Sequence, residues 1–397
     1  MIAILALAGL TYLWSRSDSS MPQVVATEAA LAAPTSISAN APQPLPLKSD
    51  PLKKNIFRAG DYLVRQQLAN GELAYQVNIL TNDRSSTPSN IRLMGGVGAL
   101  YTVCRAAEDS TYCESADLAL EHYLPNLLTD PERFKGTCLY ANGACPLGGA
   151  TITIDTIYKR WQANGSVLLN GHDLLADAVN LGYFIASMRR PEGGFYHSFD
   201  PHLAGTVDPN YVAPTFNGEA VAAFLQLYEM TGNEFWLTQA HEVNDFMLTQ
   251  TVTEDYAHAY AFALFARLDE LSKADQAYAR QIADLILAGQ IRSLNPINSS
   301  ISTATKIEAL ASISQAFALS DMEHDWLDRE IKTFITFVQA RQFPANDCNI
   351  VLTKFMIDNY SGGLFNTCED PSIRVDGVQH WVNGLTLYLE YFGMTDK

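Results

Sequence analysis

The chain has 397 residues, of which 48% are hydrophobic and 17% are charged, so it can bury a large core as one large domain or two ordinary ones. Its formal net charge is −17, from 43 acidic and 26 basic residues, and a surface this acidic disfavours binding to nucleic acid and to anionic lipid. An anionic ligand would therefore need a local basic site.

The beginning of the chain predicts export. Residues 1–14 are apolar and uncharged, which suits the core of a signal peptide but falls short of the roughly 20 residues of a membrane span. Residues 15–50 are rich in Ser, Ala, Pro and Thr, which predicts a disordered linker. We expect a periplasmic or otherwise extracytoplasmic protein, either released or held at the inner membrane by an uncleaved anchor, with residues 51–397 as the folded domain.

From residue 51 onward, two kinds of predicted helix alternate. One kind is small and apolar on nearly every side, as in a helix that is buried all round, and the other has a single apolar face. Residues 148–163 are rich in β-branched side chains that favour a strand, but their place in the alternation indicates a helix. The buried helices are predicted at 92–107, 148–163, 217–231, 255–271, 303–319 and 374–392, and the amphipathic ones at 52–68, 113–128, 167–188, 234–250, 274–288 and 325–341.

Six such helical hairpins must bury their apolar faces by closing into a ring or by stacking. A ring gives an all-α fold, the (α/α)6 toroid, with the buried helices around a central cavity and short β-hairpins in the loops. The alternative is an open solenoid of helix pairs. Unequal repeat lengths and long loops favour the closed toroid, because solenoid repeats keep a fixed period.

The six cysteines predict disulfide bonds and an oxidising compartment, because they are even in number and close in sequence. The alternative is a set of unrelated core thiols. No Cys-x-x-Cys motif occurs, which argues against a zinc ribbon. The local pairs are Cys104/Cys113, Cys138/Cys145 and Cys348/Cys368.

Polar residues gather near the beginnings of the buried helices. A carboxylate there is favoured by the helix dipole, so capping and core hydrogen bonds can explain any one of them. Their recurrence at the same end of helix after helix predicts a polar cavity instead. The residues are Arg92, Glu219, Asp255, His258, Lys306, Glu308, Asp376 and His380.

Several motifs carry a resemblance to a known superfamily: GGFY at 193–196, NGEA at 217–220, LYEMTG at 227–232, TKIE at 305–308, GGLF at 362–365 and IRVDGVQH at 373–380. Over about residues 51–393 the chain resembles the six-hairpin (α/α)6-toroid glycosidase-like superfamily, and is most similar to a bacterial toroid domain of uncharacterised activity. That superfamily includes glycoside hydrolases, unsaturated-uronate hydrolases, polysaccharide lyases and sugar epimerases. The resemblance implies an active site where the inner helices begin.

Glycoside hydrolysis requires two carboxylates that face each other across the sugar. We predict Glu219 and Asp376 as this pair, with Glu308 as the substitute. His380 lies one helical turn beyond Asp376, and an acid and a histidine at that spacing could instead abstract a proton, as an epimerase or lyase requires.

Basic and aromatic residues near the same helix ends are predicted to bind the substrate. Lys306, Arg92 and Arg374 would hold the carboxylate of a uronic acid, although Arg374 could equally form a loop salt bridge. Aromatic side chains would stack on sugar faces, and core packing is their alternative role. The predicted binding residues are His380, His258, Asp255, Arg92, Lys306, Arg374, Tyr211 and Trp381.

Neither a P-loop, a Rossmann fingerprint, Gly-x-Ser-x-Gly nor His-Glu-x-x-His occurs, so no cofactor and no metal are expected. The expected function is an exported carbohydrate-active enzyme, a glycoside hydrolase or a uronate epimerase or lyase, with a polysaccharide or oligosaccharide as its substrate. The alternative is a non-catalytic toroid that binds a glycan or a partner protein during envelope or exopolysaccharide assembly. A peptide polymer is a third class of ligand.

Overall fold

A computed structural model describes residues 51–85, 89–200, 206–207, 211–289, 295 and 297–394. The predicted signal or anchor segment (1–14) and the predicted linker (15–50) lie outside this part of the chain. Within these ranges, no helix combines the length and the apolar character that a membrane crossing requires.

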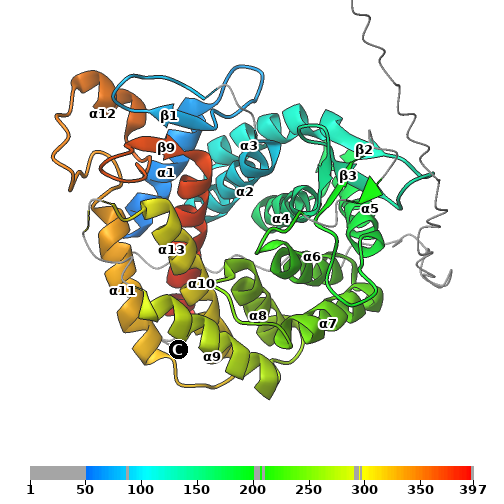
Figure 1. The fold of residues 1–397 in the computed structure, drawn as a ribbon. Coiled ribbons are helices and arrows are strands. Elements are labelled where there is room, and N and C mark those ends of the chain that lie inside the picture. Colours follow the sequence, from blue (N-terminus) through cyan, green and yellow to red (C-terminus); the bar gives the residue numbers. More distant parts are fainter. Residues whose placement is uncertain are drawn as a thin grey trace, which may run out of the picture. The chain divides into compact units, whose positions relative to one another are not determined.

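The helices alternate between an inner and an outer ring, as Figure 1 shows for the helical domain. The inner helices are α2 (Asn90–Ala107), α4 (Leu147–Asn164), α6 (Phe216–Thr231), α8 (Tyr256–Leu268), α10 (Ser300–Leu319) and α13 (Val375–Met394). The outer helices are α1 (Lys53–Gln66), α3 (Ser110–Tyr123), α5 (Leu174–Ser187), α7 (Glu234–Leu248), α9 (Lys273–Ala288) and α11 (Asp325–Gln339).

The inner ring is closed. Each inner helix packs against the next one, and α13 packs against both α10 and α2. The outer helix α1 covers α13, so the first helix of the domain lies on the last. Strand β1 (Gln76–Asn78) also pairs antiparallel with β9 (Ser372–Arg374) and ties the two ends of the domain together. The predicted (α/α)6 toroid is therefore confirmed, and the open solenoid is wrong.

Local sequence explains where the helices begin and end. Asn233 caps α7 by accepting a hydrogen bond from the backbone N–H of Phe235, and Gly232 ends α6 in the left-handed conformation. Close packing of the inner ring depends on small residues. A Cβ atom at Gly218 would lie 2.6 Å from both the Asp255 Oδ2 atom and the His258 backbone nitrogen, so only glycine lets α6 approach α8.

The structure differs from the predicted elements in the loops. The predicted helix 167–188 begins only at Leu174, because Asn170 and Gly171 have positive φ angles and form a tight hairpin between β5 (Leu168–Leu169) and β6 (His172–Asp173). A short helix that the sequence did not predict, α12 (Lys354–Tyr360), lies in the last long loop. The remaining strands are β2 (Leu127–Thr129), β3 (Thr137–Leu139), β4 (Cys145–Pro146), β7 (Ser198–Asp200) and β8 (Thr206–Val207).

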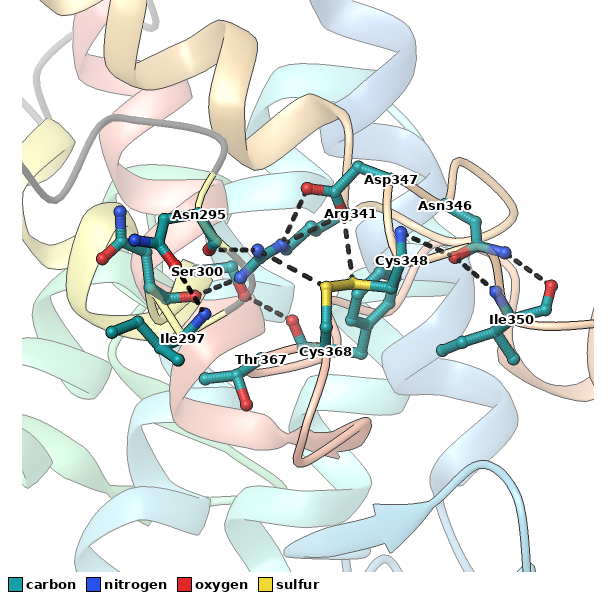
Figure 2. The surroundings of a disulfide bond; sticks show 12 residues. Asn295, Ile297, Ser300, Arg341, Asn346, Asp347, Cys348, Ile350, Thr367 and Cys368 are labelled. Carbon is teal, nitrogen blue, oxygen red and sulfur yellow. Dashed lines mark hydrogen bonds and ion pairs between the residues drawn. A yellow bond between two sulfur atoms is a disulfide. The ribbon is translucent and has the colours of Figure 1, made fainter.

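The cysteines form three disulfide bonds, which join the predicted pairs Cys104–Cys113, Cys138–Cys145 and Cys348–Cys368. Beside the third bond, the fully buried Arg341 donates hydrogen bonds to the Asp347 carboxylate at 3.1 Å and to the Asn295 carbonyl oxygen at 2.9 Å (Figure 2). It also contacts the carbonyl oxygen of Asn366, which accepts from the backbone N–H of Ser300 at 2.9 Å. Arg341 thereby fixes the loops that lead into α10 and α13.

Candidate active site

A cavity runs along the axis of the inner ring and is lined by residues from all six inner helices. Its volume is about 160 Å³, which is room for roughly 11 to 16 water molecules at about 10–15 Å³ each. The first layer of its wall lies near the helix beginnings and consists of Glu219, Tyr256, Glu308 and Gln379. The predicted polar cavity at this end of the inner helices is therefore present.

Glu219 lies in the first turn of α6 and is surrounded by hydroxyl groups. Its carboxylate accepts hydrogen bonds from the Oγ1 atoms of Thr151 and Thr215, both at 2.8 Å, and from the Tyr256 hydroxyl at 3.3 Å. Burial raises the pKa of Glu219 above its ordinary value, although these hydrogen bonds oppose the shift. Glu219 is therefore suited to hold a proton and to donate it, as a general acid must.

Glu308 and His380 form a hydrogen-bonded pair across α10 and α13. The His380 Nδ1 atom lies 2.7 Å from a Glu308 carboxylate oxygen, and the other oxygen accepts from the Asn383 amide at 3.0 Å. A carboxylate at Nδ1 favours the tautomer with its proton there, which leaves Nε2 as the basic nitrogen. The Tyr256 ring contacts His380 edge-on, with 4.9 Å between ring centroids, and connects this pair to Glu219.

The other charged side chains that line the cavity are in ion pairs. Lys159 lies 2.7 Å from Asp155, Arg105 pairs with Glu390, and Arg267 pairs with Glu229 just behind the wall. Among the described residues of the cavity wall, this leaves Glu219 and Glu308 as the carboxylates without a lysine or arginine partner. These two groups are consequently the ones available for chemistry.

The structure does not place Asp376 in the cavity wall. Its carboxylate is held by the guanidinium groups of Arg374, at 3.0 Å, and Arg92, at 3.2 Å, and both arginines also contact the Tyr75 ring. The predicted pair of Glu219 and Asp376 does not line the cavity together, and the carboxylate that lines it with Glu219 is that of Glu308. His380 is oriented by Glu308 rather than by Asp376, because the two side chains of α13 contact different neighbours.

The predicted carboxylate-binding cations are likewise engaged within the protein. Arg92 and Arg374 neutralise Asp376, and Lys306 forms an ion pair with Glu254 at 2.7 Å. None of the three lines the cavity.

Four further predicted residues lie away from the cavity wall. Asp255 caps α8, accepting from the backbone N–H groups of Ala257 and His258, and burial raises its pKa to about 8. His258 is fully buried against Asn244 of α7, and burial lowers its pKa to about 3. Trp381 is 0% exposed in the core, while Tyr211 is 43% exposed in a loop. The first three have structural rather than substrate-binding positions.

The sequence reasoning missed most of the deeper cavity wall. Nothing in the sequence assigned a role to Asp155, which lies in the β-branched part of α4. Its carboxylate lines the cavity, forms an ion pair with Lys159 and accepts a hydrogen bond from the Gln226 amide. The signal that could have found these residues is a spacing of seven, because polar residues seven apart lie on the same face of a helix, two turns from each other. The cavity-lining pairs Glu219/Gln226, Glu308/Gln315, Gln379/Thr386 and Asp155/Gln162 all have it.

Neither a protein-family model nor a curated protein matches this chain. Solved structures do match. An unsaturated glucuronyl hydrolase from Bacillus sp. GL1, responsible for the degradation of glycosaminoglycan, has a TM-score of 0.60 at 12% identity, covering 84% of this chain and 96% of its own. A cellobiose 2-epimerase from Spirochaeta thermophila has a TM-score of 0.60 at 13% identity, with 88% and 99% covered, and a D-mannose isomerase has 0.58 at 10%, with 85% and 96% covered. The chain thus shares the (α/α)6-toroid fold of these structures.

Proposed function

We propose that the protein is a carbohydrate-active enzyme that epimerises or isomerises a neutral sugar by proton transfer. The observation that carries this proposal is the meeting of two groups at one end of the cavity. These are Glu219, whose pKa is raised, and Glu308, which lines the same cavity and holds His380, outside the lining, by a hydrogen bond. Such a reaction needs one group that gives a proton and another that takes one.

In the proposed reaction, the open-chain form of the sugar binds with its carbonyl group beside Glu219. The His380 Nε2 atom takes the proton from the carbon next to the carbonyl, and the electron pair of that C–H bond forms the double bond of an enediol. Glu219 gives its proton to the carbonyl oxygen. His380 then returns its proton to carbon, and Glu219 takes up the proton of the hydroxyl group that becomes the new carbonyl. Protonation of the former carbonyl carbon gives the isomer, and protonation of the original carbon on its opposite face, after the enediol has turned in the cavity, gives the epimer.

The charges of the cavity favour a neutral substrate over a uronic acid. The cavity-lining cations Arg105, Lys159 and Arg267 each have a carboxylate partner. A uronate carboxylate would have to displace one of these partners and would lie near the acidic pair Glu219 and Glu308. Two structural neighbours are a cellobiose 2-epimerase and a D-mannose isomerase, which supports the same reaction class.

Hydrolysis is the second candidate, because Glu219 and Glu308 line the same cavity. In that reaction Glu219 would protonate the leaving oxygen and Glu308 would activate a water molecule. The hydrogen bonds from His380 and Asn383 to both oxygens of Glu308 count against it, since they leave the carboxylate less free to accept a proton.

Solvent isotope incorporation tests the proposal. The protein is incubated in D2O with D-glucose, D-mannose and cellobiose, and deuterium at C2 and the appearance of epimer or ketose are followed by NMR. We expect Glu219→Gln and His380→Gln each to lower the rate at least about a hundredfold, because general acid–base groups contribute 10²–10⁴. Asp376→Asn serves as the matched control and should retain the rate within about tenfold.

The outcomes separate the candidate functions. Release of new reducing ends from an oligosaccharide without deuterium on carbon would establish hydrolysis and refute the epimerase. Sugar binding without either reaction would leave a glycan-binding toroid. A loss of activity in Asp376→Asn that equals the loss in Glu219→Gln would contradict the assignment of the acid and the base.

A further inference from the structure

We infer that the cavity contains a second sugar-binding site, formed by Gln226, Gln315 and Thr386 (the second layer), so that the substrate is a neutral oligosaccharide rather than a monosaccharide. The inference rests on the proposed function for the reacting end of that substrate. The next sugar unit of the oligosaccharide would bind deeper in the cavity, toward the C-terminal ends of the inner helices.

The second layer lies two helical turns beyond the first one. Three inner helices place a polar residue in each layer at a spacing of seven, which corresponds to about 10 Å along the axis at 1.5 Å per residue. The pairs are Glu219/Gln226 on α6, Glu308/Gln315 on α10 and Gln379/Thr386 on α13, and all six residues line the cavity. Beyond a sugar bound at the first layer, further polar groups therefore line the same cavity.

Two polar atoms of the second layer have no hydrogen-bond partner. Gln226 and Thr386 are each only 1% exposed, yet the Gln226 Oε1 atom and the Thr386 hydroxyl are unsatisfied. The Gln226 Nε2 atom donates a hydrogen bond to Asp155 at 2.8 Å, and this bond fixes the orientation of the amide. The Oε1 atom of the same amide is the one that the protein leaves unpaired. Both residues line the cavity, so a sugar hydroxyl bound there would supply a hydrogen bond that the protein itself does not.

The surroundings of the second layer suit an uncharged sugar residue. Asp155, beside Gln226, is balanced by Lys159 at 2.7 Å. Apolar surface comes from Tyr260, Leu264 and Leu387, which line the cavity and can contact the C–H face of a sugar ring. A pyranose presents hydroxyls around its rim and C–H groups on its faces, which this combination of amides, hydroxyl and apolar wall complements.

The exposure of the cavity wall agrees with a longer ligand. At the first layer, the Glu308 and His380 side chains are 8% and 10% exposed. At the far end, the Arg267 side chain is 29% exposed. Solvent thus reaches Arg267, and a chain of sugar residues can extend from the first layer through the second and toward that end.

Calorimetric binding tests the second site without depending on turnover. The titrants are D-glucose, D-mannose, cellobiose, lactose and cellotriose, and the proteins are the wild type, Thr386→Val and the control Thr153→Val. Thr153 lies in α4 outside the cavity wall, and its hydroxyl donates to the Gly149 carbonyl oxygen at 2.7 Å. Thermal melting of each variant accompanies the titrations.

We expect at least one disaccharide to bind more tightly than either monosaccharide. Thr386→Val should weaken that binding about three- to tenfold, the value of one hydrogen bond, and change monosaccharide binding less than twofold. The same variant should melt no lower than the wild type, because the hydroxyl it removes has no partner in the free protein. Thr153→Val should leave all sugar affinities unchanged.

The second site is refuted if disaccharides bind no more tightly than monosaccharides, if Thr386→Val weakens both alike or neither, or if none of these sugars binds. These results differ from a failure of the proposed function. Chain-length-dependent binding without deuterium exchange would keep the second site and remove the epimerase, whereas exchange on a monosaccharide alone would do the reverse.

Discussion

Asp255, the buried N-cap residue of α8, should make the stability of this protein depend on pH, and the substitution Asp255→Asn should remove that dependence. Asp255 is 3% exposed, and burial raises its pKa to about 8, against roughly 3.9 in an unfolded chain. Between these two values the folded protein keeps a proton that the unfolded chain has released. The stabilisation is complete below about pH 4 and is lost as the pH rises through about 8.

The size of the effect follows from linkage. One proton bound only by the folded state changes the free energy of unfolding by about −1.36 kcal/mol per pH unit. Asp255→Asn has a side chain of the same shape that cannot ionise, and asparagine caps helices as well as aspartate. The free energy of unfolding of the variant, relative to wild type, should therefore rise by about 2.7 kcal/mol between pH 5 and pH 7.

His258 makes the comparison with the variant necessary. Burial lowers its pKa to about 3, so below about 6.5 the unfolded chain binds a proton that the folded protein does not, and stability rises with pH there. This slope opposes that of Asp255 between about pH 4 and 6.5, and the wild-type curve alone would hide both. The difference between wild type and Asp255→Asn cancels the histidine contribution.

Guanidinium unfolding with the disulfide bonds intact measures the effect, followed by fluorescence at pH 5, 6 and 7. Asp245→Asn, on the exposed surface of α7, controls for the exchange itself. If the stability difference between Asp255→Asn and wild type stays constant over this range, Asp255 is ionised in the folded protein and the reasoning from burial is refuted.

Two further predictions concern packing and the loop anchor. Gly218→Ala should lower the free energy of unfolding by at least about 2 kcal/mol. The reason is that its Cβ atom would lie 2.6 Å from the His258 backbone nitrogen, which cannot move without shifting α8. An unchanged unfolding midpoint would contradict this contact. Arg341→Lys should lower the free energy of unfolding by about 3 kcal/mol, since an ammonium group cannot reach the Asp347 carboxylate and three backbone carbonyls at once. A variant with wild-type thermal stability would show that the contacts of Arg341 with the loops are dispensable.

The amino-acid sequence determined the fold because its signals are local. The alternation of all-apolar and amphipathic helices, the Gly232–Asn233 turn and the short cysteine spacings each act within a few residues, and the structure agrees with them. The hairpin at Asn170 and Gly171 and the short helix α12 were missed, because turn and loop segments lack the periodicity that marks a long helix.

Tertiary structure alone decided which polar residues face the cavity. A helix that is apolar on nearly every side has no hydrophobic stripe to fix its rotation, so α10 and α13 take their orientation from the neighbours packed on both sides. That rotation turned Glu308 toward His380 and the cavity, and left Asp376 to the guanidinium groups of Arg92 and Arg374. Of these arginines, Arg92 approaches Asp376 from α2, far away in the sequence, whereas Arg374 at the end of β9 lies only two residues before it.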